Sequence, residues 1–280
     1  MTSNESIANK EKIALIAGIV LLIAGIVLGL TNKQVLFEAW LVGFIFCVGL
    51  PFGSACITAV HFLSHGKWGF TIRKPALAAM KTFPLVALYA LPVLFGLNVL
   101  YSWTNPEVVH ANHLIEHKIA YLNPAFFGIR TVFYFIAWIF LAILFEKKGG
   151  ELLEDVSEEG RIKLQRIGGL GILALVFTGT FASFDWVMSL TPEWFSTIFG
   201  ILSVVSQSLL ALCVLVITAK KMLPEGRSSE PDVAARFHEL GNLMLALVML
   251  WMYMSFSQFF IIWSGNLPEE ILYYLPRSHG

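Results

Sequence analysis

The chain has 280 residues, of which 57% are hydrophobic and only 14% are charged. Soluble globular domains carry roughly 25% charged residues, so this chain has too few polar side chains to cover a water-exposed surface. Its 19 basic residues balance its 19 acidic residues, which excludes a basic face for nucleic acid. We therefore expect an integral membrane protein.

The amino-terminal stretch and the cysteines exclude two further classes. The apolar stretch that follows Met1–Lys12 has no small-residue cleavage site, so we predict a retained first span rather than a cleaved signal peptide. The three cysteines, Cys47, Cys56 and Cys213, all lie in apolar stretches. Their spacing fits neither a zinc site nor an iron–sulfur cluster, and it excludes a disulfide framework.

Seven stretches are long and apolar enough to cross a bilayer as helices, which takes about 20 residues each. Their unbroken apolarity favours helices over barrel strands, which would alternate between apolar and polar residues. The sequence therefore predicts an all-α, polytopic transmembrane helical bundle that forms one membrane domain over residues 1–280. The predicted spans, in chain order, are Ile13–Leu30, Leu36–Leu63, Phe83–Tyr101, Phe126–Phe145, Ile167–Leu190, Phe195–Thr218 and Gly241–Trp263.

Lysine and arginine are distributed very unevenly between the two sides of these spans. Fifteen fall on the side of the amino terminus and three on the other, with Arg130 inside the fourth span. Loops rich in Lys and Arg stay in the cytoplasm, so we predict a cytoplasmic amino terminus. The odd number of spans then places the carboxyl terminus outside, in the periplasm of a bacterium.

Four polar side chains are predicted to lie at one level, near the outer ends of four different spans: Arg130, Asp185, Gln258 and Glu38. Charges within a bilayer are costly and usually functional. One interpretation is a quinone head-group pocket or the mouth of a proton path, with Asp185 as proton acceptor, Arg130 as its partner and Gln258 as hydrogen-bond donor to a carbonyl. The other is an Arg130–Asp185 ion pair that only locks the bundle, with Glu38 in the head-group region.

A second set of polar residues lies deeper or nearer the cytoplasmic side. His61, Thr178 and Gln207 could relay protons to Asp185 with the help of water, and His238 precedes the seventh span. The alternative, which we favour for the serines and threonines, is packing at helix contacts, a common use of small polar residues in membranes.

Metal chemistry finds little support in the sequence. A bis-histidine haem needs paired histidines inside the membrane, and His61 is the one histidine clearly within a span, so we expect no haem. His110, His113 and His117 follow an i, i+3, i+7 pattern in the string HANHLIEH. They could bind zinc, but a solvated interfacial helix is the preferred interpretation, and we predict no metal in this chain.

Other activities lack their motifs. The chain has no Walker loop, no GxGxxG after a strand and no nucleophile elbow, so neither ATP-driven transport nor hydrolase chemistry is indicated. A secondary transporter would require helix breaks at matched positions. Pro84 and Pro92 interrupt the third span without a matching pair elsewhere, and this alternative ranks low.

Four strings carry a resemblance to a known family. They are SFDWVMSLTPEWFSTIFG (Ser183–Gly200), KIAYLNPAFFGIRTVFYFIAW (Lys118–Trp138), RIGGLGILALVFTGTFASFDW (Arg166–Trp186) and HELGNLMLALVMLWMYMSFSQFFIIWSGNLPEE (His238–Glu270). In these the chain resembles the ActF-type, NrfD-like (polysulfide-reductase-C-like) membrane subunits of alternative complex III, also described as quinone-binding subunit 2 of quinol:cytochrome c oxidoreductase. The similarity covers roughly the carboxyl-terminal 60% of the chain.

The resemblance implies a place in a bacterial respiratory chain. Such a subunit holds no haem or metal and is not catalytic alone. It contributes to binding of quinol, such as menaquinol, and to proton translocation in the inner membrane. Its partners would be the homologous NrfD-like subunit, the iron–sulfur subunit and the c-type haem subunits, besides lipid. Family members have about ten spans, so we expect a carboxyl-terminally shortened version of that fold.

The resemblance also selects residues. Asp185, Arg130, Gln258, His238 and the corner from Tyr121 to Asn123 fall within the matching strings and are the best site candidates. Whether this subunit binds quinol itself is left open. The alternative is a structural or proton-conducting subunit with no quinone site of its own.

Overall fold

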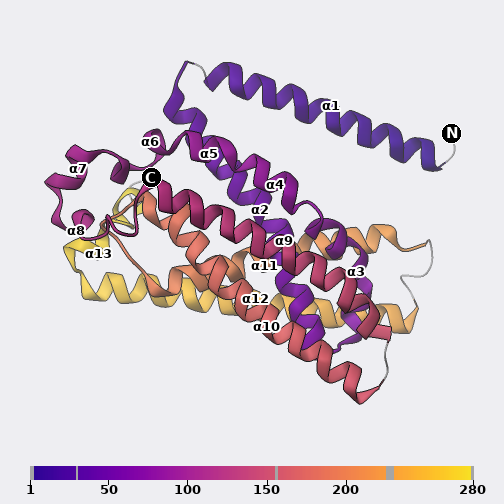
Figure 1. The fold of residues 1–280 in the computed structure, drawn as a ribbon. Coiled ribbons are helices and arrows are strands. Elements are labelled where there is room, and N and C mark those ends of the chain that lie inside the picture. The colour runs from indigo at the N-terminus through magenta and orange to yellow at the C-terminus, as the bar shows by residue number, and fades with distance from the viewer. Residues whose placement is uncertain (1–2, 30, 155–156, 225–229, 279–280) are drawn as a thin grey trace.

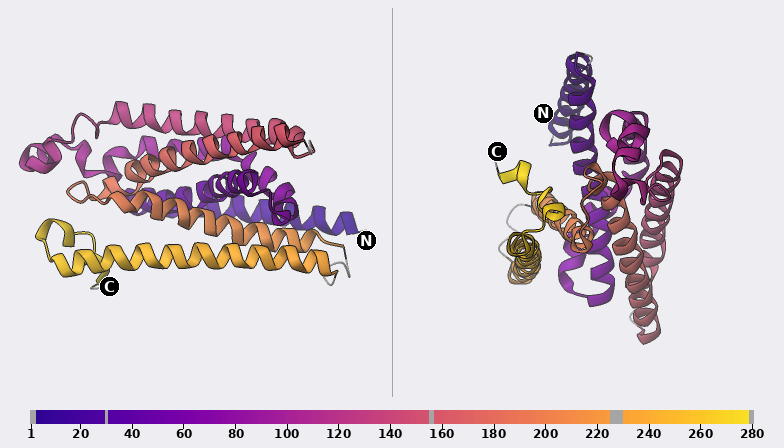
Figure 2. Two further views of the ribbon diagram at one scale, coloured as in Figure 1. Left: turned by 90° about the horizontal axis from the view of Figure 1, so that it is seen from below. Right: turned by 90° about the vertical axis from the view of Figure 1, so that its left-hand side faces the viewer.

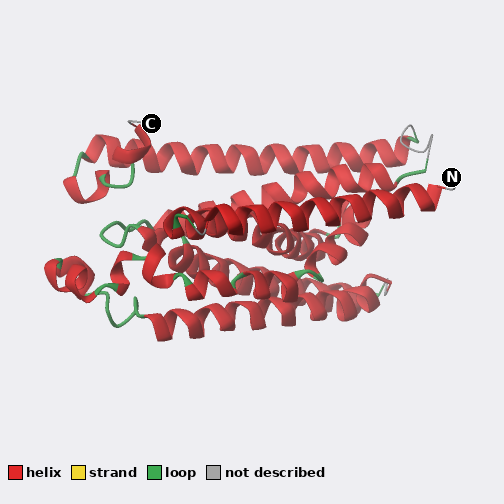
Figure 3. Ribbon diagram, turned by 90° about the horizontal axis from the view of Figure 1, so that it is seen from above, coloured by secondary structure: helices red, strands yellow, loops and turns green. Residues whose placement is uncertain are grey.

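In the computed structural model, the described residues are 3–29, 31–154, 157–224 and 230–278, and the elements found in them are all helical. The long helices are α1 (Ser3–Gly29), α2 (Lys33–Ser64), α9 (Pro124–Glu154), α10 (Glu158–Trp186), α11 (Thr197–Met222) and α12 (Pro231–Gly265). They run lengthwise through the molecule, with the loops gathered at its two ends (Figures 1 and 3). Six helical stretches of this part are long and apolar enough to span a membrane, and a shorter apolar stretch covers Leu15–Val27 in α1.

Local sequence signals explain where these helices begin. Asn32 accepts hydrogen bonds from the backbone N–H groups of the first turn of α2, and Ser157 does the same for α10. Asn123 accepts one from Phe126 N at 2.9 Å, at the start of α9. Asparagine and serine are preferred at this position because their oxygens satisfy N–H groups that have no partner in the helix.

Helix α2 lies at the centre of the bundle and packs against α9, α10 and α11. Glycines allow the close approach. A Cβ atom on Gly53 would lie 2.1 Å from the backbone oxygen of Gln207 in α11, and one on Gly168 would lie 2.8 Å from that of Ala59. Small residues at crossings let membrane helices pack by backbone contact, so α2, α10 and α11 form a tight seam.

The third predicted span differs most from the structure. In place of one helix over Phe83–Tyr101, the chain forms α3 (Lys67–Met80), α4 (Phe83–Tyr89), α5 (Leu91–Phe95) and α6 (Leu97–Leu100). Helices α4 and α5 each begin with a proline in the first turn, Pro84 and Pro92. Proline lacks the N–H that would continue the preceding helix. The apolar stretch long enough to span therefore runs from Lys67 to Phe95, which moves the span towards the amino terminus.

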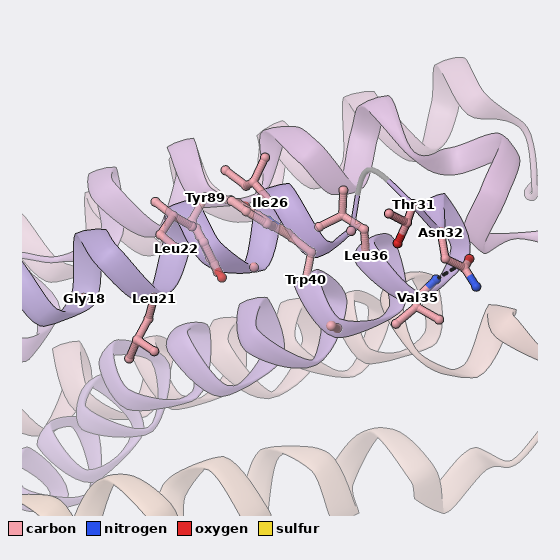
Figure 4. A pocket seen from close by; sticks show the side chains of 13 residues that line it. Gly18, Leu21, Leu22, Ile26, Thr31, Asn32, Val35, Leu36, Trp40 and Tyr89 are labelled. Atoms are coloured by element: carbon pink, nitrogen blue, oxygen red, sulfur yellow. Dashed lines mark hydrogen bonds between the residues drawn. The ribbon is translucent and has the colours of Figure 1, made fainter.

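Helix α1 stands apart from the rest of the bundle (Figures 1 and 2). Its apolar side chains are exposed along the described length, Leu21 to 72%. The groove between α1, α2 and Tyr89 has a volume of about 520 Å³ and is walled chiefly by apolar side chains (Figure 4). None of its lining residues is a predicted site residue, so this groove is not where the charged groups meet.

The two ends of the bundle are different in character. The end that holds the start of α1 also holds the end of α9, the start of α10, the end of α11 and the start of α12 (Figure 1). The opposite end, called here the α13 end, is built from the short elements. These are η1 (Ser102–Thr104), α7 (Pro106–Ala111), α8 (His113–Glu116), η2 (Met188–Leu190), α13 (Pro268–Ile271) and α14 (Leu275–Ser278).

Candidate functional site

Arg130 and Asp185 meet in the interior near the α13 end. Arg130 Nε donates to Asp185 Oδ2 at 2.8 Å and Nη2 donates to Oδ1 at 2.9 Å. The Asp185 side chain is fully buried, and Arg130 is 8% exposed. Such a two-pronged pair matches the planar guanidinium to the carboxylate. It keeps both groups charged where a lone charge would be very costly.

Two tyrosines complete this cluster. Tyr134 donates its hydroxyl to Asp185 Oδ2 at 2.6 Å, and the backbone oxygen of Tyr121 accepts from Arg130 Nη1 at 2.9 Å. The guanidinium also lies over the Tyr121 and Phe126 rings, 3.8 and 4.3 Å from their centroids. We call Arg130, Asp185, Tyr134 and Tyr121 the buried ionic cluster.

Local structure fixes the orientation of the cluster. Arg130 and Tyr134 are four residues apart on α9 and therefore share one face. Trp186, next to Asp185 on α10, donates its indole N–H to Thr131 Oγ1 at 3.2 Å and accepts from the Tyr101 hydroxyl at its backbone oxygen at 2.9 Å. Through these two hydrogen bonds, Trp186 joins α10 both to α9 and to the turn that follows α6. Sequence reasoning missed Tyr134 as a site residue, although its spacing from Arg130 was the available signal.

The Tyr121 hydroxyl is the one polar atom of the cluster that is buried without a hydrogen-bond partner among the described residues. Burial raises the pKa of this phenol, and the Asp185 charge raises it further while Arg130 lowers it. Tyr121 lines a cavity of about 140 Å³ with Ser189 and Trp194. Tyr121 is therefore the member of the cluster that borders this cavity.

Lys118 lines the same cavity as Tyr121. Its ammonium donates to the backbone oxygen of Pro192 at 2.6 Å, which joins the loop before α9 to the loop before α11. Partial burial lowers the pKa of Lys118, and Glu193 opposes that shift. The neighbouring Asn112 donates to Glu193 at 3.1 Å. The two loops therefore hold each other over the cluster.

Two of the four side chains predicted to share one level do not join the cluster. Glu38 is exposed on α2 and accepts a hydrogen bond from Gln34 at 2.9 Å. Gln258 lies on α12, 6% exposed, and lines a separate pocket with residues of α11 and α13. Position along a helix places side chains at one level of the membrane. Whether they contact one another depends on the direction in which each side chain projects from its helix.

Asn123 and His238 have simpler positions. Asn123 caps α9, and its amide also donates to the backbone oxygens of Ile119 and Ala120. His238 is exposed near the start of α12. Asn123 thus serves helix formation beside the cluster, and His238 lies away from it.

The proposed relay is not joined by direct hydrogen bonds. His61 is buried among the rings of Phe62, Trp68 and Phe70, and its Nε2 has no partner among the described residues. Thr178 donates to the backbone oxygen of Ala174 and accepts from Trp138.

Gln207 and the serines of α11 also serve the helix contacts. Gln207 packs where α11 meets Gly49 and Gly53 of α2. Ser203, Ser206 and Ser208 each donate to a backbone oxygen four residues earlier. The serine hydroxyls of α11 are therefore hydrogen-bonded within their own helix, and Gln207 lies at the contact between α11 and α2.

The described residues contain no group of three or more His, Cys, Asp or Glu side chains arranged to hold a metal ion. Of the HANHLIEH histidines, His113 and His117 approach each other at 3.1 Å between their Nε2 atoms, on an exposed surface. His110 faces Glu116 instead, at 4.0 Å. The three histidines do not converge on one point.

Comparison with family models and with curated proteins gives no match to this chain. The site is therefore interpreted from its own geometry. That geometry is a saturated ionic cluster, one buried phenol without a partner, and a separate polar pocket beside α12.

Proposed function

We propose that the chain is a membrane subunit of a bacterial respiratory quinol:cytochrome c, or quinol:acceptor, oxidoreductase of the alternative complex III type, and that its buried ionic cluster handles protons. The main support for this proposal is that two of the sequence stretches that carry the family resemblance contact each other in the structure. Lys118–Trp138 contributes Arg130, Tyr134 and Tyr121, and Ser183–Gly200 contributes Asp185. The strings that carry the resemblance thus supply every member of one hydrogen-bonded cluster.

The cluster has the groups that proton transfer requires. Asp185 is a carboxyl group at membrane depth that accepts two hydrogen bonds from Arg130. A phenol can both donate and accept a proton. Tyr134 donates its hydroxyl to the carboxylate, and the buried hydroxyl of Tyr121 lies close to both Asp185 and Tyr134, in a residue that also lines a cavity. A proton released by quinol oxidation would pass between the carboxylate and the cavity through these tyrosines.

In this proposal the metal centres belong to the partner subunits, and quinol is a substrate rather than a resident group. The partners are the homologous NrfD-like subunit, the iron–sulfur subunit and the c-type haem subunits. The subunit lies in the inner membrane with its amino terminus in the cytoplasm, in keeping with fifteen basic residues on that side of the spans and three on the other.

A second candidate is a subunit in which the cluster only locks the bundle. It is favoured by the saturation of Asp185, whose two oxygens accept hydrogen bonds from Arg130 and Tyr134. Both candidates predict a loss of stability when the Arg130–Asp185 pair is broken. They differ for substitutions that keep the shape of the side chain but remove its charge or hydroxyl: turnover falls only if the cluster handles protons.

The first experiment is affinity purification of the tagged protein from its native membrane, with peptide mass spectrometry, a reduced-minus-oxidised haem spectrum and a quinol:cytochrome c assay. We expect iron–sulfur and c-type haem subunits to co-purify with activity. A haem-free protein without redox partners would overturn the assignment.

The second experiment separates the two candidates in the same complex. If the cluster handles protons, Tyr134→Phe and Asp185→Asn lower turnover and change its solvent isotope effect while subunit composition stays intact. Gln34→Leu, at an exposed position of the same end, serves as the control. Full activity of both variants in an intact complex would leave only the structural role.

A further inference from the structure

A second polar site lies on the other side of Phe195 from the buried ionic cluster. This pocket of about 310 Å³ is bounded by the start of α11, the end of α12 and α13. Its lining residues are Phe195, Ser196, Thr197, Ile198, Gln258, Ile261, Ile262 and Glu270. We call it the α11–α12 pocket. It does not depend on the function proposed above.

Gln258 points to a ligand in this pocket. Its side chain is 6% exposed, and its Oε1 is buried without a hydrogen-bond partner among the described residues. A buried amide oxygen without a hydrogen-bond donor destabilises the folded protein, because it has lost its water and gained no partner. A group that donates a hydrogen bond from within the pocket would remove this destabilisation.

The first turn of α11 supplies the opposite chemistry. The pocket is lined by residues 195–198, where this 26-residue helix begins, and Ser196 makes no capping hydrogen bond with its side chain. The N–H groups of a first turn have no partner inside the helix and carry the positive end of its dipole. They are suited to an anionic oxygen such as that of a phosphate.

Glu270 sets the charge of the site. It is the one ionisable residue among the lining residues, and no base accompanies it. A ligand with net negative charge would meet this carboxylate uncompensated. A ligand that carries a cation beside its anionic group would pair with it.

The remaining walls are apolar and reach the surface of the bundle. Ile198, Ile261 and Ile262 line the pocket, and the neighbouring Phe256, Phe259 and Phe260 of α12 are exposed. Helix α12 lies along one side of the molecule (Figure 2). A ligand here would have its polar part in the pocket and an apolar part along α12, as a membrane lipid does.

We propose that the α11–α12 pocket binds the head group of a zwitterionic aminophospholipid, with the phosphate at the start of α11 and the ammonium donating to Gln258 Oε1 and pairing with Glu270. The requirement for an N–H donor discriminates against choline, whose methylated nitrogen cannot donate. The carboxylate and the lack of a base discriminate against anionic glycerol lipids. The site therefore selects ethanolamine head groups on two separate grounds.

The test uses the full-length protein, within its native complex if it has one, exchanged into detergent and offered an equimolar mixture of phosphatidylethanolamine, phosphatidylcholine and phosphatidylglycerol. Native mass spectrometry then measures the retained lipid. We expect enrichment of phosphatidylethanolamine by about tenfold over the other two, the ratio that one charge-assisted hydrogen bond supplies. Gln258→Leu and Glu270→Gln should each bring the enrichment close to equality.

Matched controls are Gln34→Leu and Glu107→Gln, which change the same residue types at exposed positions of the α13 end and should keep the preference. Equal retention of phosphatidylcholine would overturn the donor requirement, and equal retention of phosphatidylglycerol would overturn the charge requirement. Displacement of the lipid by added quinol would assign the pocket to quinol instead. Because lipid selectivity is measured first on the unaltered protein, the proposal stays testable even if a variant fails to fold.

Discussion

The buried ionic cluster and the α11–α12 pocket lie at the same end of the bundle. They differ in whether the Asp185 carboxylate of the one and the Gln258 amide oxygen of the other have hydrogen-bond donors within the protein. In the cluster both oxygens of Asp185 have donors, and the residues around it are packed between α2, α9 and α10. In the pocket Gln258 presents a buried oxygen with no protein partner, beside an uncapped helix start. The Asp185 carboxylate is therefore satisfied by the protein itself, whereas the Gln258 oxygen is satisfied by the lipid head group in the proposal above.

The largest expected effect comes from breaking the pair. Arg130→Leu would leave the Asp185 carboxylate buried with Tyr134 as its remaining donor, and loss of one partner of a buried pair costs about 3–5 kcal/mol. We expect a large fall in the thermal midpoint of the purified protein, or failure to accumulate in the membrane. The measurement is fluorescence-detected thermal unfolding in detergent.

The double variant Arg130→Leu with Asp185→Leu sharpens this prediction. Replacing both members of a buried pair by apolar residues is often close to neutral. The double variant should therefore be more stable than Arg130→Leu alone. If it is equally unstable, the damage arises from packing and not from the uncompensated charge.

An intermediate effect is expected for Tyr134→Phe. It removes the hydroxyl that donates to Asp185 Oδ2 and keeps the ring, which stacks beside Trp138. A hydrogen bond to a charged group contributes about 1.5–3 kcal/mol, so the thermal midpoint should fall by less than in Arg130→Leu. A larger fall than in Arg130→Leu would contradict the order of the two interactions.

Gln258→Leu should show the opposite behaviour from the cluster variants. Without aminophospholipid, the leucine removes an unsatisfied oxygen, so stability should equal or exceed that of the unaltered protein. With phosphatidylethanolamine added, the unaltered protein should gain stability and the variant should not. Thermal unfolding in the two lipid conditions checks this. An equal gain in both proteins would refute the role of Gln258.

The smallest effect concerns pH and Lys118, whose pKa burial lowers from 10.5. Between the lowered pKa and 10.5 the unfolded chain binds more protons at this residue than the folded chain, so stability from this group rises with pH there. The thermal midpoint of the unaltered protein, measured relative to that of Lys118→Met, should therefore increase as the pH approaches 10.5. A difference that stays flat or shrinks would show that Lys118 is not held by burial.

Much of the fold follows from composition and periodicity. Five of the predicted spans overlap α2, α9, α10, α11 and α12, although α9, α10 and α12 each extend nine or ten residues beyond one predicted end. Within the third predicted span the structure has the short helices α4, α5 and α6 in place of one helix, with Pro84 and Pro92 in the first turns of α4 and α5. Proline ends backbone hydrogen bonding without changing hydropathy, so the break is invisible to an apolar count.

The site was predictable to a lesser degree. Arg130 and Asp185 were identified because an ionisable side chain at membrane depth needs a partner, and each was the obvious partner for the other. Glu38 and Gln258 were grouped with them by depth, but their helices face elsewhere. Tyr134 was missed although it follows Arg130 by four residues and therefore shares its face of α9.

The sequence alone determined that this is a helical membrane protein and which charges are too costly to leave unpaired, because hydropathy and the cost of buried charge depend on residue type and depth. Tertiary structure alone decided which polar groups meet. It joined Arg130 and Asp185 through the packing of α9 on α10, and it left Gln258 facing the start of α11. Which face of each helix packs against its neighbours depends on contacts between residues far apart in the sequence, such as the close approach of Gly53 in α2 to Gln207 in α11.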